Sequence, residues 1–435
     1  MQLSTGQDGV PAAGAGPHRK QLLALMMAMF FAFGFCTVLV DTLIPKLKAM
    51  FALNYTEVML TQFCFFGAYF IISTPAGWLM TRIGYLRGMV VGLSVMAFGA
   101  LLFTPAAMLG TYPGFLGALF ILAAGVTTVQ VAANPLTASL GAPEQAPSRL
   151  TLAQAFNSLA TMVGPIVGSE VILRHVAVLP DAASMPQGAL AVLRRHEAAV
   201  FQAPFLLISL VLFGLAVLCW SVRAWSPLKL AGAQGAALRL LRNRRLMLGA
   251  MAIFAYVGAE VSIGSSIANF LMQGEVLGVA AQTAGRLVSI YWGLAMAGRF
   301  LGTVVLRMAP PGLVLSACAA AACGLAIVTG ASAGVMAAGC ILAIGLFNSI
   351  MFPTIFTLAI ETLGDDAAEA SGVLCLAIVG GAVVPLLTGF AADHLGLAHA
   401  LLVPALCYVW IVYFGAGAYR DSQRLRAAPA AAVLS

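Results

Sequence analysis

This chain has very little charge: 9% of its 435 residues are Asp, Glu, Lys or Arg, whereas 61% are hydrophobic. Soluble domains carry about 25% charged residues, so this balance excludes an ordinary soluble globular protein. The apolar runs are about 20 residues long and lack the period-2 alternation of strands, which excludes a transmembrane β-barrel. The remaining class is a protein whose helices cross a membrane.

Motifs for other chemistries are also missing. There is no GxxxxGK[ST] sequence for a nucleotide and no CxxC pair, and the five histidines are scattered over helix ends and loops. No nucleophile–base arrangement indicates an enzyme. The eight cysteines lie in apolar segments, where we expect small core residues. We therefore expect no cofactor, no metal site and no catalytic residue, with energy supplied by an ion gradient or by the substrate gradient itself.

What the sequence does contain is a series of twelve apolar segments, each long enough to cross a bilayer as a helix. They are 21–45, 57–80, 87–107, 113–140, 150–174, 201–222, 246–273, 284–307, 312–330, 334–360, 368–391 and 397–418. A basic stretch divides them into two groups of six, which predicts an all-α membrane protein of two six-helix bundles with pseudo-two-fold symmetry. The predicted parts are a disordered N-terminus (1–20), an N-terminal bundle (21–222), a basic linker (223–245), a C-terminal bundle (246–418) and a tail (419–435).

The charges suggest an orientation rather than a nucleic-acid partner. The formal net charge is +7, and Lys and Arg gather at helix ends. The positive-inside rule places both termini on the cytoplasmic side of the membrane. We expect this membrane to be a bacterial inner membrane. Arginines in the loop after the fifth span run against the rule, as does an acidic turn after the tenth span that contains Glu361, Asp365, Asp366 and Glu369. No cleavable signal peptide is evident, so we expect the first span to direct insertion.

Four amides interrupt two consecutive apolar segments. Gln130 and Asn134 precede Pro135 in the fourth, and Gln154 and Asn157 share one face of the fifth. Lipid cannot form hydrogen bonds with an amide, so each needs a polar cavity or another polar group. Helix–helix hydrogen bonding would explain one or two of them. Four on neighbouring helices favour a site for a polar ligand.

Further candidates for contact with a neutral sugar lie on other spans. They are Gln62, Asn269, Tyr291, Trp292 and Asn348. Amides both donate and accept hydrogen bonds and so suit sugar hydroxyls, whereas aromatic rings suit the apolar faces of a pyranose. A sugar contact is favoured more for Asn348 than for the aromatic residues, because Pro353 interrupts the hydrogen bonding of its helix nearby. For the aromatic residues, ordinary packing or an interfacial belt is the alternative interpretation.

Two carboxylates fall well inside predicted spans, Asp41 in the first and Glu260 in the seventh. An ionised aspartate there costs about 2.5–3.5 kcal/mol on insertion scales unless it is protonated, paired or in contact with water. No Lys or Arg at membrane depth is an obvious partner for Asp41, although Lys48 on its own helix is conceivable. Proton coupling is therefore favoured for Asp41 over solvation at a helix end. For Glu260 two interpretations stay open. It could line a cavity, where it accepts a hydrogen bond from a sugar hydroxyl or shares the proton, or it could form a structural hydrogen bond to a neighbouring helix.

Several longer strings resemble known transporters. GWLMTRIGYLR (77–87) resembles the loop motif of the major facilitator superfamily at Gly77, Arg82, Gly84 and Arg87, but it has Thr81 where the motif has aspartate. The other strings resemble the fucose/glucose/galactose permease family of proton-linked sugar symporters. They are QVAANP (130–135), RLTLAQAFNS (149–158), YVGAEVSIGS (256–265), YWG (291–293) and the segment from Phe33 to Asp41.

This resemblance implies a monomeric secondary transporter of the major facilitator fold in the lipid bilayer, which imports a neutral monosaccharide with a proton by alternating access. It implies proton coupling at Asp41, a sugar contact at Asn157 and a gating role for the 77–87 loop. The fucose branch has glutamate at the position of Gln130, so the glutamine tilts the expected substrate towards glucose or galactose, with fucose and mannose as alternatives. Three other functions stay open: sodium coupling at Asp41 with Thr37 and Thr42, uncoupled sugar transport, and drug or metabolite antiport.

Overall fold

The computed structural model describes residues 18–51, 55–109, 111–168, 205–225 and 239–432, which are helical apart from short turns. Ten of the described helices are long and apolar enough to cross a membrane, and a shorter apolar helix spans Phe205–Ser221. Together with α5 (Ala146–Gly168) these segments overlap all twelve predicted spans. The predicted all-α membrane fold is confirmed. The exact domain boundaries stay predictions, since most of the proposed linker lies outside the described residues.

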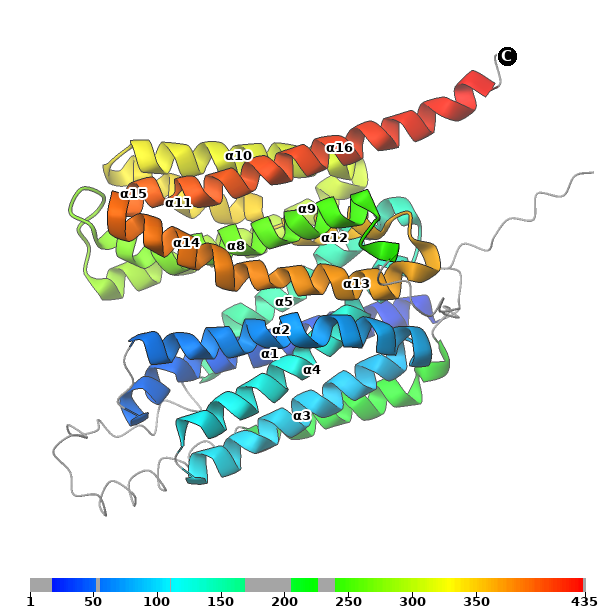
Figure 1. Cartoon of the computed structure of the whole chain (residues 1–435), viewed down its shortest axis with the longest axis horizontal. Coiled ribbons are helices and arrows are strands. Elements are labelled where there is room, and N and C mark those ends of the chain that lie inside the picture. Colours follow the sequence, from blue (N-terminus) through cyan, green and yellow to red (C-terminus); the bar gives the residue numbers. More distant parts are fainter. Residues whose placement is uncertain (1–17, 52–54, 110, 169–204, 226–238, 433–435) are drawn as a thin grey trace, which may run out of the picture.

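The helices form two layers, one from each half of the chain (Figure 1). The first half contains α1 (Arg19–Phe51), α2 (Tyr55–Ile83), α3 (Tyr85–Leu109), α4 (Tyr112–Ser139), η1 (Pro143–Gln145), α5, the helix Phe205–Ser221 and η4 (Arg223–Trp225). The second half contains α8 (Arg244–Met272), α9 (Ala281–Met308), α10 (Pro311–Ala331), α11 (Gly334–Asn348), α12 (Met351–Ile360), η5 (Gly364–Asp366), α13 (Ala367–Leu376), η6 (Ala377–Val379), α14 (Gly380–Leu395), α15 (Leu397–Ala400) and α16 (Leu402–Ala432). The halves meet mainly where α2 packs on α13 and α5 packs on α9.

Prolines explain where two of the spans depart from regular helix. Pro353 has no amide hydrogen to give to the carbonyl of Ser349, and the tenth predicted span is split there into α11 and α12. Pro135 inside α4 likewise leaves the carbonyl of Val131 without its helical partner. That carbonyl accepts a 2.8 Å hydrogen bond from the hydroxyl of Ser371 on α13. A carbonyl left without its helical partner in the first half is thus hydrogen-bonded by a hydroxyl of the second half.

Two glycines allow the close approach of α2 and α13. A Cβ atom added at Gly372 would lie 2.7 Å from the carbonyl oxygen of Ser73, and one at Gly77 would lie 3.2 Å from that of Ala368. A Cβ contact under 3.0 Å requires something to shift. The two helices therefore pack backbone to backbone, which brings the two halves of the chain together where α2 meets α13.

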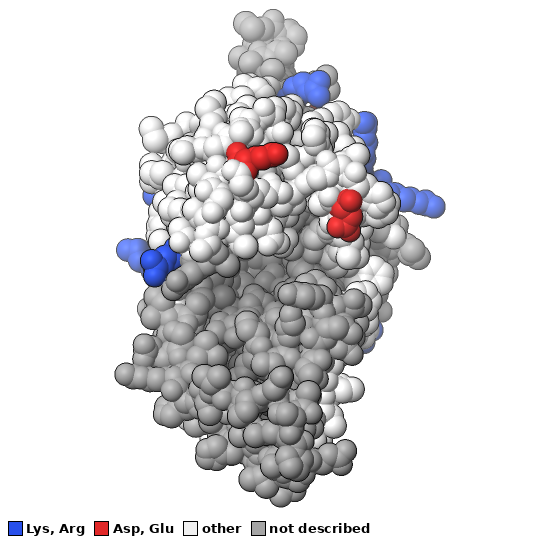
Figure 2. Space-filling model, turned by 90° about the vertical axis from the view of Figure 1, so that its left-hand side faces the viewer, with Lys and Arg blue, Asp and Glu red and all other residues white. Residues whose placement is uncertain are grey.

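The first turns of α1, α3 and α8 and the last turns of α16 each carry arginine, and they lie at the same end of the molecule, on the right in Figure 1. We call this the basic end. Here Arg239 pairs with Asp366, and Arg245 pairs with Glu361 at 2.5 Å. These pairs account for two acids of the turn that ran against the positive-inside rule. The opposite end, shown in Figure 2, has a mainly uncharged described surface with acidic side chains on it and basic ones at its margins.

Candidate functional site

A cavity of about 180 Å³ lies between the two halves, which we call the central cavity. Its polar side chains come from both halves and are Thr37, Gln130, Gln154, Asn157, Thr161, Glu260 and Arg299. Its aromatic side chains are Phe33, Phe65, Tyr69, Tyr256 and Phe352. This mixture of hydrogen-bonding groups and flat apolar rings suits a small polar solute that also has an apolar face.

The first half contributes the amides that the sequence predicts. The Nε2 atom of Gln130 donates a 2.9 Å hydrogen bond to the hydroxyl of Tyr69, which lies on α2. The Nδ2 atom of Asn157 donates to the carbonyl of Phe30 on α1 at 3.1 Å. This contact requires Gly34, because a Cβ atom there would lie 2.3 Å from the Asn157 amide nitrogen. The neighbouring helices thus fix the orientation of both amides.

The second half contributes a carboxylate and a guanidinium group. The hydroxyl of Tyr256 donates a 2.8 Å hydrogen bond to Glu260, one turn further along α8. Arg299 on α9 donates through Nη1 to the carbonyl of Gln154 at 3.1 Å and to the hydroxyl of Ser158, so it links α9 to α5. Its Nε atom donates at 3.4 Å to the Ser349 carbonyl that Pro353 leaves free. Among the described residues, the lining of the central cavity therefore holds one acidic and one basic group.

The sequence analysis did not identify Arg299: as a cation for Asp41 it considered only Lys48 on the same helix. It lies eight residues inside the predicted span 284–307. An arginine at such a depth is itself a signal, because charged residues inside membrane helices are rare and face the interior or a polar cavity. The search for charged residues inside the spans was made for acids. The same search for basic residues would have identified Arg299.

Asn134 lies outside the lining of the central cavity although it shares a helix face with Gln130. It is buried, its Nδ2 atom is 4.0 Å from the sulfur of Cys375 on α13, and its Oδ1 atom has no partner among the described residues. The amide therefore lies at the contact of α4 with α13, on the side of the basic end. The two predicted wall residues of α4 occupy different environments.

Asn348 and Tyr291 form a buried network within the second half. Asn348 donates through Nδ2 to the hydroxyl of Tyr291 at 3.0 Å, and its Oδ1 atom accepts from the hydroxyl of Tyr408 at 2.8 Å. All three side chains are fully buried, and none lines the central cavity. Asn269 and Trp292 are exposed and also lie outside the lining. Of the candidates in the second half, the cavity brings in Glu260.

Two predicted residues lie in helices but have side chains outside the described residues: Asp41 on α1 and Gln62 on α2. The predicted gating loop is described and joins α2 to α3. Gly84 adopts a φ of +85°, which favours glycine, and the guanidinium of Arg82 stacks on Trp78 at 4.1 Å. Arg87 is exposed at the start of α3.

The comparisons with known proteins agree with this arrangement. Residues 23–378 match the model of the Major Facilitator Superfamily. The chain is 48% identical to a "Glucose/galactose transporter" of Brucella abortus over 90% of this chain and 93% of that protein. It is 32% identical to an "L-fucose-proton symporter" of Escherichia coli over 92% of this chain and 94% of that protein. The crystal structure of the transporter FucP "in the outward conformation" superposes with a TM-score of 0.83 at 31% identity, over 91% of this chain and 98% of that one.

Proposed function

This chain belongs to the Major Facilitator Superfamily, and from that premise we propose that it imports a neutral hexose of the glucose/galactose type together with a proton. The chain is a transporter rather than an enzyme. The proposed partners are the sugar, the coupling proton and the surrounding bilayer, and the proposed working unit is a monomer.

The lining of the central cavity is the observation that carries this proposal. Gln130, Gln154 and Asn157 offer both donors and acceptors without net charge, as the hydroxyls of a neutral sugar require. Phe33, Phe65 and Phe352 offer apolar surface for the ring of the sugar. A volume of about 180 Å³ is well below the roughly 300–1,000 Å³ of sites for drug-sized ligands. The small volume and the three amides in the lining both count against a drug exporter.

The charged residues would divide the remaining work. Arg299 and Glu260 both line the cavity, so the guanidinium would offset the charge of the carboxylate when Glu260 accepts a hydrogen bond from a substrate hydroxyl. Asp41 on α1 is left as the group that takes up and releases the coupling proton. Protonation would make it neutral and so favour the reorientation of the loaded carrier, because burying an ionised carboxylate costs several kcal/mol.

The relatives support the choice of substrate and of coupling ion. Two relatives carry the names of a glucose/galactose transporter and an L-fucose-proton symporter. Gln130 replaces the glutamate of the fucose branch, which favours glucose or galactose over fucose. The hydrogen bond from Gln130 to Tyr69 supports a role as a neutral contact.

Alternating access would begin from a conformation that is closed at the basic end. The interhelical bonds between the halves run from the cavity towards that end: Arg299 to Gln154, and Ser148 to the carbonyl of Thr303 at 2.6 Å. The α2–α13 contact lies on the same side, where Figure 1 shows α13. We propose that these contacts, together with the 77–87 loop, form the inner gate and must separate before the sugar is released.

The distribution of charge supports the proposed orientation in the membrane. Arginines of α1, α3, α8 and α16 lie at the basic end, whereas the opposite end is mainly uncharged over its described surface. The positive-inside rule then places the basic end and both termini in the cytoplasm. The proposed location is the bacterial inner membrane.

Counterflow tests the substrate assignment without depending on the coupling ion. Purified protein is reconstituted into liposomes loaded with unlabelled glucose, galactose, fucose, mannose or xylose, and entry of labelled glucose is followed. Glucose and galactose should drive the largest transient accumulation, and Gln154→Ala should abolish it. No accumulation with any hexose from a correctly folded protein would contradict the proposal.

A further inference from the structure

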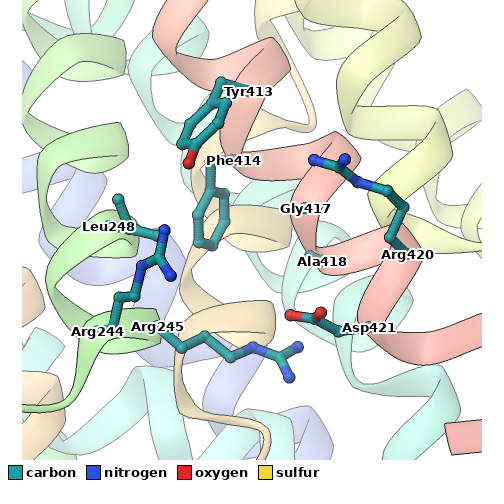
Figure 3. A pocket seen from close by; sticks show the side chains of 9 residues that line it. All are labelled: Arg244, Arg245, Leu248, Tyr413, Phe414, Gly417, Ala418, Arg420 and Asp421. Atoms are coloured by element: carbon teal, nitrogen blue, oxygen red, sulfur yellow. The ribbon is translucent and has the colours of Figure 1, made fainter. Parts of the chain in front are cut away.

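A second cavity, of about 410 Å³, lies at the basic end between α8 and α16 and shares no lining residue with the central cavity. We call it the α8–α16 pocket. Figure 3 shows that Arg244 and Arg245 reach it from α8, and Tyr413, Phe414 and Arg420 reach it from α16. Arg244 and Arg420 stand on opposite sides of Phe414 in this view. Nothing in the proposed transport mechanism uses this pocket.

The pocket has an excess of positive charge that the described protein does not neutralise. Its lining contains three arginines and one acid, Asp421. Among the described residues Arg244 has no hydrogen-bond or ion-pair partner, and Arg420 donates only to a carbonyl of its own helix at 3.3 Å. Arg245 pairs with Glu361, but its Nε atom is buried and has no acceptor among the described residues. Such groups favour an anion with several acceptor oxygens.

An apolar face of α16 leads directly into the pocket. Leu402, Leu406, Val409 and Tyr413 are all exposed, and their spacing of four, three and four residues places them on one face of the helix. The same spacing continues through Gly417 to Arg420, both of which line the pocket. On α8, Met251 is exposed two turns after Arg244 and on the same face. Apolar surface that faces lipid therefore ends at unpaired guanidinium groups.

We propose that the α8–α16 pocket binds the phosphate headgroup of an anionic phospholipid, with the acyl chains along the exposed face of α16. The phosphate oxygens accept hydrogen bonds from Arg244 and Arg420, and Arg245, which is paired with Glu361, adds positive charge beside them. Basic pockets between membrane helices on the cytoplasmic side are suited to such headgroups. The aromatic ring of Tyr413 lies where headgroup and chain would meet, a position that amphipathic rings favour.

The apolar face distinguishes a lipid from a soluble phosphate. A free phosphate or a soluble phosphate ester would use the arginines but would gain nothing from Leu406, Val409 and Tyr413. A phospholipid uses both, because its chains remain in the membrane while its headgroup enters the pocket. The charge excess further favours an anionic lipid over a zwitterionic one.

Native mass spectrometry of the full-length protein tests this site. Delipidated protein in detergent is titrated with dioleoylphosphatidylglycerol, with dioleoylphosphatidylcholine, which has the same chains, and with inorganic phosphate. Arg244→Gln and Arg420→Gln should each weaken binding of the phosphatidylglycerol about fivefold, whereas Arg244→Lys should retain most of it. Arg242→Gln is the matched control, since Arg242 is exposed beside the same helix and does not line the pocket.

Four results would overturn the assignment. The pocket variants could bind the anionic lipid as tightly as the unmodified protein, or the Arg242 control could lose as much affinity as they do. Phosphatidylcholine could bind as tightly as phosphatidylglycerol. Inorganic phosphate could compete at the affinity of the lipid, which would identify a site for soluble anions. Folding of each variant is checked by its melting temperature, and Arg244 has no hydrogen bond or ion pair to lose among the described residues.

Discussion

Arg299 on α9 donates a 3.1 Å hydrogen bond to the backbone carbonyl of Gln154 on α5 and so joins the two halves of the chain beside the central cavity. The same guanidinium reaches Ser158 and the carbonyl of Ser349, where Pro353 interrupts the helix. These acceptors offset the cost of an arginine at membrane depth. They also make Arg299 a bridge that must break when the halves move apart.

Replacing Arg299 should disable transport more than it disturbs the fold. Arg299→Gln removes the bridge and leaves Glu260 without a balancing charge, so we expect kcat/KM for sugar uptake to fall about tenfold or more. Arg286→Gln on the same helix is the matched control, because Arg286 is exposed and does not line the cavity. Uptake by Arg299→Gln at the control rate would refute the bridging role.

Replacing Asn348 should affect stability rather than substrate affinity. Asn348→Ala leaves the hydroxyls of Tyr291 and Tyr408 without the amide that joins them, and interhelical hydrogen bonds in membranes are worth about 0.6–1.7 kcal/mol each. The melting temperature in detergent should fall while KM for the sugar stays the same. Asn269→Ala, at an exposed position on α8, should change neither. If Asn348→Ala raises the KM for the sugar and leaves the melting temperature unchanged, Asn348 is a substrate contact and not a structural residue.

A methyl group at Gly372 should hold the basic end open. The added carbon would lie 2.7 Å from the carbonyl of Ser73, so α13 and α2 cannot keep their present contact. We expect faster backbone hydrogen exchange near residues 73–80 and 368–376 in Gly372→Ala, with a lower rate of uptake. Gly389→Ala is the control in the same span, since a Cβ there meets nothing within 4 Å. Equal exchange in both variants would show that this contact does not close the inner gate.

The amide of Gln130 should contribute to sugar affinity through a neutral hydrogen bond. Gln130→Ala removes a group that lines the cavity, and the loss of one such bond should raise KM about threefold to tenfold. Tyr69→Phe, which removes the hydroxyl that Gln130 contacts at 2.9 Å, should give a smaller effect in the same direction. If Gln130→Ala leaves the KM for glucose and galactose unchanged, Gln130 is not a substrate contact.

Helix positions could be predicted from the sequence because apolar length alone decides which segments can cross a bilayer. Gln130, Gln154, Asn157 and Glu260 could also be placed near one another, since unpaired polar groups at that depth need a cavity. The partner of each amide could not be predicted. Asn348 has the same chemistry as Asn157, yet Tyr291 and Tyr408 satisfy it within one half. Which polar residue faces the cavity depends on helix rotation, and that is set by distant contacts such as the one at Gly34.

The direct test of hexose–proton symport is the pH of a lightly buffered suspension of de-energised cells or proteoliposomes after a sugar is added. Glucose or galactose should make the medium alkaline as protons enter with the sugar, and fucose should do so more weakly. Asp41→Asn should abolish this change and all accumulation while it spares counterflow exchange. Uptake that follows sodium with no change in pH, or an Asp41→Asn protein that still concentrates sugar, would contradict the account.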